Sequence, residues 1–90
     1  MRITFDALKR EKNLKDKGLD FRQAAQVFGS VTATIIDGRR DYGEPRYVTY
    51  GRLDDQVVVI IWTPRGGARR IISMRKANGR EIKKIGTSLG

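Results

Sequence analysis

The chain has 90 residues, of which 19 are basic and 10 are acidic, and its formal net charge is +9. It contains no cysteine and no histidine, which excludes disulfides, thiolate or imidazole metal ligands, and catalysis by either side chain. Its longest apolar run, residues 57–62, is far shorter than the ~20 residues that cross a bilayer. We therefore expect a cytoplasmic protein that neither is exported nor spans a membrane.

The first part of the chain predicts one strand followed by two helices. Polar and apolar residues alternate over residues 2–5, which is typical of a short strand. Asp6 is expected to cap a helix over residues 7–17, and Gly18 is well placed to end it. Residues 20–28 begin with a capping-box pattern and continue with apolar residues at helical spacing, so they predict a second helix.

From residue 31 onward the pattern is extended and predicts four strands before a terminal helix. The predicted strands are residues 31–37, 45–53, 56–63 and 68–74, and the predicted helix is residues 76–84. Gly79 falls inside that helix, where it costs about 1 kcal/mol relative to alanine. We expect an α+β fold in one domain over residues 1–85, with the order β-α-α-β-β-β-β-α. The sheet is expected to be mostly antiparallel with helices on one face, and residues 86–90 to form a flexible tail.

Positive charge is concentrated near the end of the chain. Residues 65–84 hold eight basic residues and one acidic residue, a surplus of seven. Such a field attracts polyanions, which points to nucleic acid, an acidic protein or an anionic membrane. The alternative is a solvated surface that keeps the protein soluble. On the first interpretation, Arg69, Lys76 and Arg80 are expected to contact RNA.

The acidic residues give little support for a metal or nucleotide cofactor. Asp37, Asp41 and Glu44 are the only acids near one another, and they flank a loop rich in arginine, so we disfavour a two-metal site. Gly66-Gly67 is better explained as a hairpin turn than as a phosphate-binding loop, because no Lys-Ser or Lys-Thr follows it. We expect neither a metal nor a cofactor.

Period-two alternation in the last predicted strand places arginine on both faces. One face is expected to carry Ile71, Ser73 and Arg75, and the other Arg70, Ile72 and Met74. Glu44 and Arg46 should share a face of an earlier strand. A pair between Glu44 and either Arg46 or Arg75 could simply satisfy the sheet edge. The functional interpretation requires a surplus of cations free to meet phosphate.

These residue types suit RNA cleavage without a metal. The reaction removes a proton from the ribose 2′-hydroxyl, stabilises a negatively charged phosphorane and protonates the leaving 5′-oxygen. Arginine suits the middle task because its planar fork bonds two phosphate oxygens. Glu44 could be the base, and Lys9 or Lys17 could replace it or act as the acid. Three tyrosines could stack on unpaired bases or pack on the sheet: Tyr42, Tyr47 and Tyr50.

Four segments spanning nearly the whole chain carry a family resemblance. They are Phe5-Asp6 with Lys9 and Asn13, residues 17–21 with 24–28, residues 41–46, and residues 70–77. The most specific is Arg70-Ile71-Ile72-Ser73-Met74-Arg75-Lys76-Ala77 after a strand, with Glu44-Pro45-Arg46 upstream. In these residues the chain resembles the BrnT-type ribonuclease toxins of bacterial type II toxin-antitoxin systems, which have a RelE-like fold.

The resemblance implies an endoribonuclease that cleaves RNA and stops translation. It also implies a BrnA-type antitoxin, dimeric through a ribbon-helix-helix domain, that neutralises the toxin; operator DNA would be bound only through their complex. The residues carried over as catalytic are Glu44, Arg46, Arg70, Ser73 and Arg75. The residues expected to bind RNA are Lys9, Asn13, Lys17, Arg69, Lys76 and Arg80.

Two departures from the family pattern favour a second hypothesis. Many family members have histidine where Lys17 stands, and their terminal helix carries a Glu-Arg pair and a tyrosine where this chain has Gly79-Arg80-Glu81. The alternative is therefore a catalytically impaired or non-catalytic module that binds RNA or antitoxin. Direct DNA binding by the basic terminal helix is a third possibility.

Overall fold

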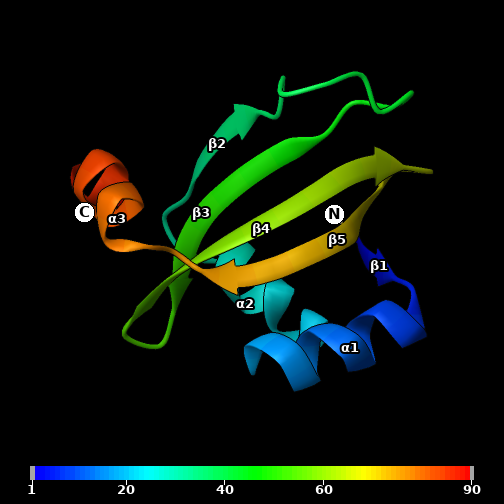
Figure 1. Cartoon of the computed structure of the whole chain (residues 1–90), viewed down its shortest axis with the longest axis horizontal. Coiled ribbons are helices and arrows are strands. Elements are labelled where there is room, and N and C mark those ends of the chain that lie inside the picture. The colour runs from blue at the N-terminus through cyan, green and yellow to red at the C-terminus, as the bar shows by residue number, and fades with distance from the viewer. Residues whose placement is uncertain (1, 90) are drawn as a thin grey trace.

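A computed structural model describes residues 2–89, which form one five-stranded sheet and three α-helices (Figure 1). The elements are β1 (Arg2–Phe5), α1 (Ala7–Lys17), η1 (Phe21–Gln23), α2 (Ala24–Phe28), β2 (Ala33–Ile36), β3 (Tyr47–Leu53), β4 (Gln56–Arg65), β5 (Ala68–Lys76), α3 (Gly79–Ile85) and η2 (Gly86–Leu89). Both η elements are short 3₁₀ helices. The α+β class and the predicted element order are confirmed.

The strands lie in the order β1-β5-β4-β3-β2. β1 runs parallel to β5, and the other three neighbouring pairs are antiparallel, which confirms a mostly antiparallel sheet. β4 is central and almost wholly apolar. Within residues 2–89, none of the helices is both long and apolar enough to cross a bilayer.

Helix α1 begins and ends for local reasons, whereas the segment after it depends on a contact with α1. The Asp6 carboxylate accepts hydrogen bonds from the backbone N–H groups of Leu8 and Lys9, and Gly18 ends α1 in the left-handed region, both as predicted. The predicted helix over residues 20–28 is instead a 3₁₀ turn followed by a short α2. Asp20 caps that turn and also binds the Arg10 guanidinium through two hydrogen bonds of 2.7 and 2.8 Å. This pair holds η1 against α1.

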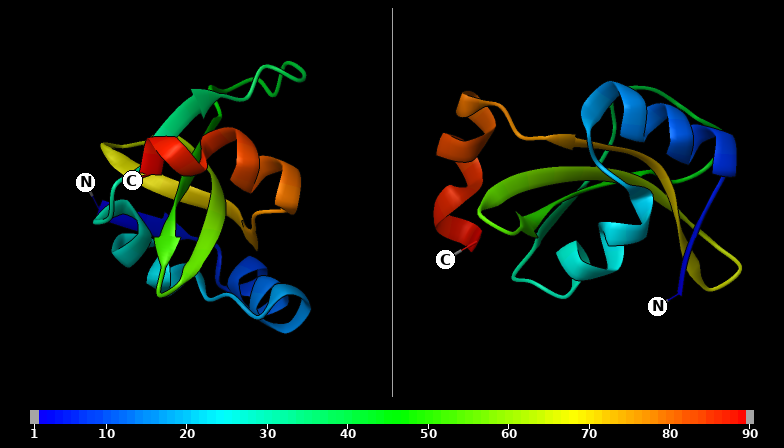
Figure 2. Two further views of the ribbon diagram at one scale, coloured as in Figure 1. Left: turned by 90° about the vertical axis from the view of Figure 1, so that its left-hand side faces the viewer. Right: turned by 90° about the horizontal axis from the view of Figure 1, so that it is seen from below.

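The hydrophobic core lies between the sheet and the layer formed by α1, η1 and α2 (Figure 2). Its buried members are Leu19, Phe21, Ala24, Val27, Leu53, Val58, Ile60, Trp62, Ile71 and Met74. The approach of α2 to β3 is close, because a Cβ built on Gly51 would lie 2.7 Å from Val27 Cγ1. Helix α3 does not join this layer but lies at one end of the sheet (Figures 1 and 2). The expectation that the helices share one face was therefore wrong for α3.

The end of the chain differs from prediction in three respects. Strand β5 continues to Lys76, and α3 begins only at Gly79, after a capping box formed by Asn78 and Glu81. Gly79 is thus the first helical residue, and the cost expected for glycine in a helix interior does not arise. The sequence predicted a flexible tail over residues 86–90, whereas Gly86–Leu89 form η2 and the Leu89 side chain is buried. Residue 90 lies outside the described residues.

Candidate functional site

A β-bulge in β5 decides which side chains lie together. Ile61 of β4 pairs with Ser73, but the next residue, Trp62, pairs with Ile71, so Ile72 is an extra residue on β5. A bulge of this kind reverses the alternation of side chains on the strand that carries it. The faces predicted from strict period-two alternation were therefore wrong on one side of Ile72.

The bulge places three predicted catalytic residues on one face. Paired residues project to the same side of a sheet, and Arg70, Ser73 and Arg75 pair with Thr63, Ile61 and Val59, which alternate along β4. Ile71, which was predicted to lie with Ser73, instead joins Met74 in the core. We call the side of the sheet away from α1 and α2 the open face; it carries Val48, Tyr50, Val59, Ile61, Thr63, Arg70, Ser73 and Arg75.

A pocket of about 260 Å³ lies on the open face. We call it the open-face pocket; it is lined by Ile35, Ile36, Asp37, Gly38, Arg39, Val48, Tyr50, Ile61, Arg75 and Glu81. In this pocket Arg75 donates two parallel hydrogen bonds to Glu81, of 2.7 and 2.8 Å. The Arg75 guanidinium lowers the pKa of Glu81 to about 2, and Glu81 in turn raises the pKa of Arg75. Both groups are therefore fully charged at neutral pH.

Three further polar residues complete this pocket. Burial raises the pKa of the Tyr50 phenol, and the negative charge of nearby Glu81 adds to the effect, so Tyr50 keeps its proton. Arg39 binds Asp37 through hydrogen bonds of 2.8 and 2.9 Å and lowers the pKa of that carboxyl to about 2. The pocket thus presents two guanidinium–carboxylate pairs and one neutral phenol.

Glu44 and Arg46 lie together in a separate cluster, but in the loop before β3 and not on a strand as predicted. Glu44 accepts a 2.9 Å hydrogen bond from Arg65, and its other oxygen lies 4.0 Å from Arg46 Nη2. The Arg46 guanidinium carbon lies 3.9 Å from the Tyr42 ring centroid. The cluster lies beside Thr63 of β4, because the Thr63 hydroxyl donates to the carbonyl of Pro45, the residue between Glu44 and Arg46. Thr63 is four residues along β4 from the partner of Arg75, or roughly 13 Å at the usual rise of a strand.

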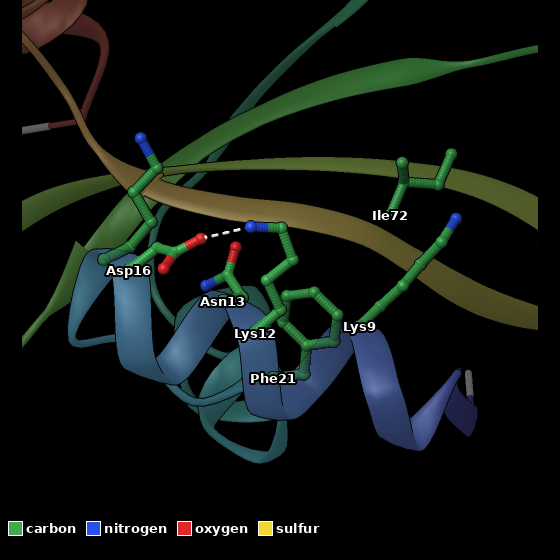
Figure 3. Close-up of a pocket in the computed structure, with 7 residues that line it drawn as sticks. Lys9, Lys12, Asn13, Asp16, Phe21 and Ile72 are labelled. Atoms are coloured by element: carbon green, nitrogen blue, oxygen red, sulfur yellow. Dashed lines mark hydrogen bonds and ion pairs between the residues drawn. The ribbon is translucent and has the colours of Figure 1, made fainter.

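A second pocket, of about 320 Å³, lies between α1 and β5, and Figure 3 shows its lining. The predicted RNA-binding residues Lys9, Asn13 and Lys17 all line it. Asn13 has a structural task there: its amide donates to the carbonyls of Leu19 and Met74, and its oxygen accepts from the Met74 N–H. Because β1 pairs with β5 only as far as Ile71, the Asn13 side chain takes the place of a strand at Met74.

The other predicted RNA-binding residues lie apart from the open face. Arg69 lies on the helix side of the sheet, with its guanidinium carbon 4.1 Å from the Phe28 ring centroid and 5.3 Å from that of Trp62. It covers an aromatic cluster there. Lys76 lines a shallow pocket beside Gly18, and Arg80 is exposed in the first turn of α3.

The prediction from sequence did not include Glu81 as the partner of Arg75, and it did not place Tyr50 beside these two residues. One signal was present, because Asn78-x-x-Glu81 is a capping-box pattern that would start the last helix at Gly79 and bring Glu81 back toward β5. Within residues 2–89, no group of three acidic side chains is arranged to hold a metal ion. Asp37, Asp41 and Glu44 bind Arg39, the Gly43 backbone and Arg65 respectively.

Fold, charge and site together define a small basic α+β protein with arginines gathered on one face of its sheet. The family model described as "Ribonuclease toxin, BrnT, of type II toxin-antitoxin system" matches residues 5–81. The chain therefore belongs to the BrnT family of ribonuclease toxins, and an antitoxin partner follows from that membership. A search of curated proteins found no match.

Proposed function

We propose that the chain is a metal-independent endoribonuclease that inhibits translation in the cytoplasm and is neutralised by a BrnA-type antitoxin with a ribbon-helix-helix domain. Operator DNA is bound only through the toxin–antitoxin complex. The observation that carries the proposal is the common face of Arg70, Ser73 and Arg75, with the open-face pocket beside Arg75. A phosphodiester lying along β5 would meet all three side chains.

Arg75 is the group best placed to stabilise the transition state. The 2′-oxygen forms a bond to phosphorus, the bond from phosphorus to the 5′-oxygen breaks, and the products are a 2′,3′-cyclic phosphate and a 5′-hydroxyl. Arg75 offers two N–H donors to the non-bridging oxygens, where charge develops. Ser73 adds a hydroxyl on the same face, and Arg70 binds an adjacent phosphate.

Glu81 and Tyr50 are the groups that would carry the protons. The Glu81 carboxylate accepts the proton of the 2′-hydroxyl, and the neutral Tyr50 phenol donates one to the leaving 5′-oxygen. A phosphate that binds Arg75 leaves Glu81 with fewer donors, which raises the pKa of Glu81 toward its ordinary value. Glu44 is held by Arg65 instead, so Glu44 and Arg46 are assigned to a flanking nucleotide.

Metal independence is supported by the partners of the carboxylates. Asp37, Glu44 and Glu81 each accept a hydrogen bond from an arginine, which occupies oxygens that a metal ion would need. Electrostatic stabilisation by such fixed donors can replace that of a metal ion.

Cleavage of a defined RNA in EDTA tests this proposal. The parent chain should produce 2′,3′-cyclic phosphate ends and should fail on an RNA with a single 2′-deoxy substitution at the cleavage site. Arg75→Ala should lower the rate by roughly 100- to 1,000-fold, the usual effect of removing one such donor. Arg2→Ala removes the same charge from an exposed position on β1 and serves as the control. Undiminished cutting by Arg75→Ala would reject the assignment.

One observation favours the alternative of a non-catalytic module that binds RNA or antitoxin. Arg75 and Glu44, the predicted arginine donor and base, are both already paired with groups of the chain itself. Induction in growing cells separates the two functions. A nuclease arrests growth and is rescued by its antitoxin, whereas a pure binding module leaves growth unchanged.

A further inference from the structure

Strand β2 leaves a row of backbone groups without partners at one edge of the sheet. It is the outermost strand on its side, and the Asp37 N–H donates to the Arg46 carbonyl at 2.8 Å. In an antiparallel pair, every second residue of a strand directs its backbone N–H and C=O groups at the neighbouring strand. The backbone groups of Ile35 therefore also bond to β3. The N–H and C=O groups of Thr34 and Ile36 therefore point away from the sheet, and nothing in residues 2–89 bonds to them.

This edge is also apolar on both of its faces. Ile35 is 55% exposed and Ile36 is 72% exposed, and alternation sends their side chains to opposite faces of β2. Val31, just before the strand, is 62% exposed. Edge strands are usually protected by a charged side chain, a proline or a bulge. Ala33-Thr34-Ile35-Ile36 contains neither a charged residue nor a proline, and its pairing with β3 is regular.

We propose that the β2 edge receives an extended, net acidic segment of the antitoxin, which adds to the sheet as a sixth strand. The inference rests on the proposed function, in which an antitoxin is the partner. Thr34 and Ile36 would pair with the added backbone, and the partner's alternate apolar side chains would cover Ile35 on one face and Ile36 on the other.

Charge favours an acidic occupant over a second copy of this chain. Each copy carries a net charge of +9, so two copies would repel one another as their edges approach. Arg40, which follows β2, forms no ion pair with any acid in residues 2–89, and neither do Lys83 and Lys84 of α3. An acidic segment would be attracted by the same charges that repel a second copy.

A segment bound at the β2 edge would also inhibit the proposed nuclease activity. Ile35 and Ile36 line the open-face pocket that holds Arg75 and Glu81. A strand added beside β2 would lie at the rim of that pocket and obstruct the approach of a phosphodiester. Neutralisation would then need no change in the conformation of the toxin.

Amide hydrogen exchange, measured on the full chain alone and with saturating antitoxin, tests the inference. In the free chain the Ile35 amide should exchange slowly, and those of Thr34 and Ile36 rapidly. The antitoxin should slow the exchange of the Thr34 and Ile36 amides by at least about tenfold. If antitoxin binds and both amides exchange as before, this inference alone is overturned. If it does not bind at all, the partner assignment fails as well. If the free chain cleaves no RNA but the antitoxin still protects the edge, only the nuclease assignment is rejected.

A pair of variants gives a second readout. Ile36→Glu places a negative charge on the edge and should weaken antitoxin binding by at least about tenfold, as measured by calorimetry. Leu8→Glu makes the same charge change at a residue that is 75% exposed on α1, and should bind like the parent. Equal affinities for both variants would overturn the inference. A free parent chain that is dimeric, and becomes monomeric on Ile36→Glu, would assign the edge to a second copy instead.

Discussion

Arg75 of β5 and Glu81 of α3 are joined by two parallel hydrogen bonds of 2.7 and 2.8 Å. The pair holds α3 at the end of the sheet and, with Tyr50, brings an acid, a cation and a phenol into the open-face pocket. It links the stability of the last helix to the state of the site. A phosphate that takes Arg75 away from Glu81 would loosen the attachment of α3.

Glu81→Gln should destabilise the fold in a pH-dependent way. The pKa of Glu81 is lowered from 4.5 to about 2, so its contribution is complete above pH 4.5 and is lost as the pH falls toward 2. We expect a loss of about 1 kcal/mol at pH 7, the scale of a partly exposed pair, and a smaller difference from the parent near pH 2. Urea unfolding at both pH values measures this. Glu11→Gln, at an exposed position of α1, is the control, and a deficit independent of pH would contradict the prediction.

Gly51→Ala should destabilise the packing of α2 on β3. The added Cβ would lie 2.7 Å from Val27 Cγ1 and 3.1 Å from the Val27 carbonyl oxygen, so α2 must move. The expected loss is about 1 to 3 kcal/mol in the free energy of unfolding. Gly38→Ala, where an added Cβ meets nothing within 4 Å, is the matched control. Equal urea midpoints for the two variants would show that α2 accommodates the methyl group.

Asn13→Ala should expose the edge of β5. It leaves the Met74 N–H and C=O and the Leu19 carbonyl without their hydrogen-bond partner, at a cost of roughly 1 to 3 kcal/mol. Exchange of the Met74 amide should accelerate more than that of its neighbours. Lys15→Ala, on an exposed part of the same helix, controls for the change in helix propensity. An unchanged Met74 exchange rate would contradict the structural task assigned to Asn13.

The salt dependence of RNA binding should separate the arginines of the two sides of the sheet. The logarithm of affinity falls with the logarithm of salt by about 0.7 for each phosphate neutralised on a single strand. Arg75→Ala should therefore lower the slope by about that amount. Arg69→Ala should leave the slope unchanged, because Arg69 lies over Phe28 and Trp62 on the helix side. A reduced slope for Arg69→Ala would place RNA on that side instead.

Sequence reasoning succeeded where the cause of structure is local. The Asp6 cap, the left-handed Gly18 and the order of the elements along the chain each follow from a few neighbouring residues. It failed where a contact distant in sequence decides the outcome. Asp20 binds Arg10 across ten residues, which ties the 3₁₀ turn to α1 in place of the continuous helix that its capping pattern predicts.

The same limit applies to the site. Glu44 and Arg46 were expected together because they are two residues apart, and they do lie together. Whether Arg75 pairs with Glu44 or Glu81 depends on where α3 begins, and that could not be fixed without the Asn78 cap. The predicted roles of these residues in catalysis and RNA binding stay predictions.

Ile72, the extra residue of the bulge, sets the interval between Arg70 and Ser73 at three positions where a regular strand would require two or four. If β5 kept Ile72 but paired with β4 without a bulge, strict alternation would turn Arg70 toward the helices while Ser73 and Arg75 kept their orientation. The common face of Arg70, Ser73 and Arg75 therefore depends on one irregularity in strand pairing as well as on the identity of the three residues.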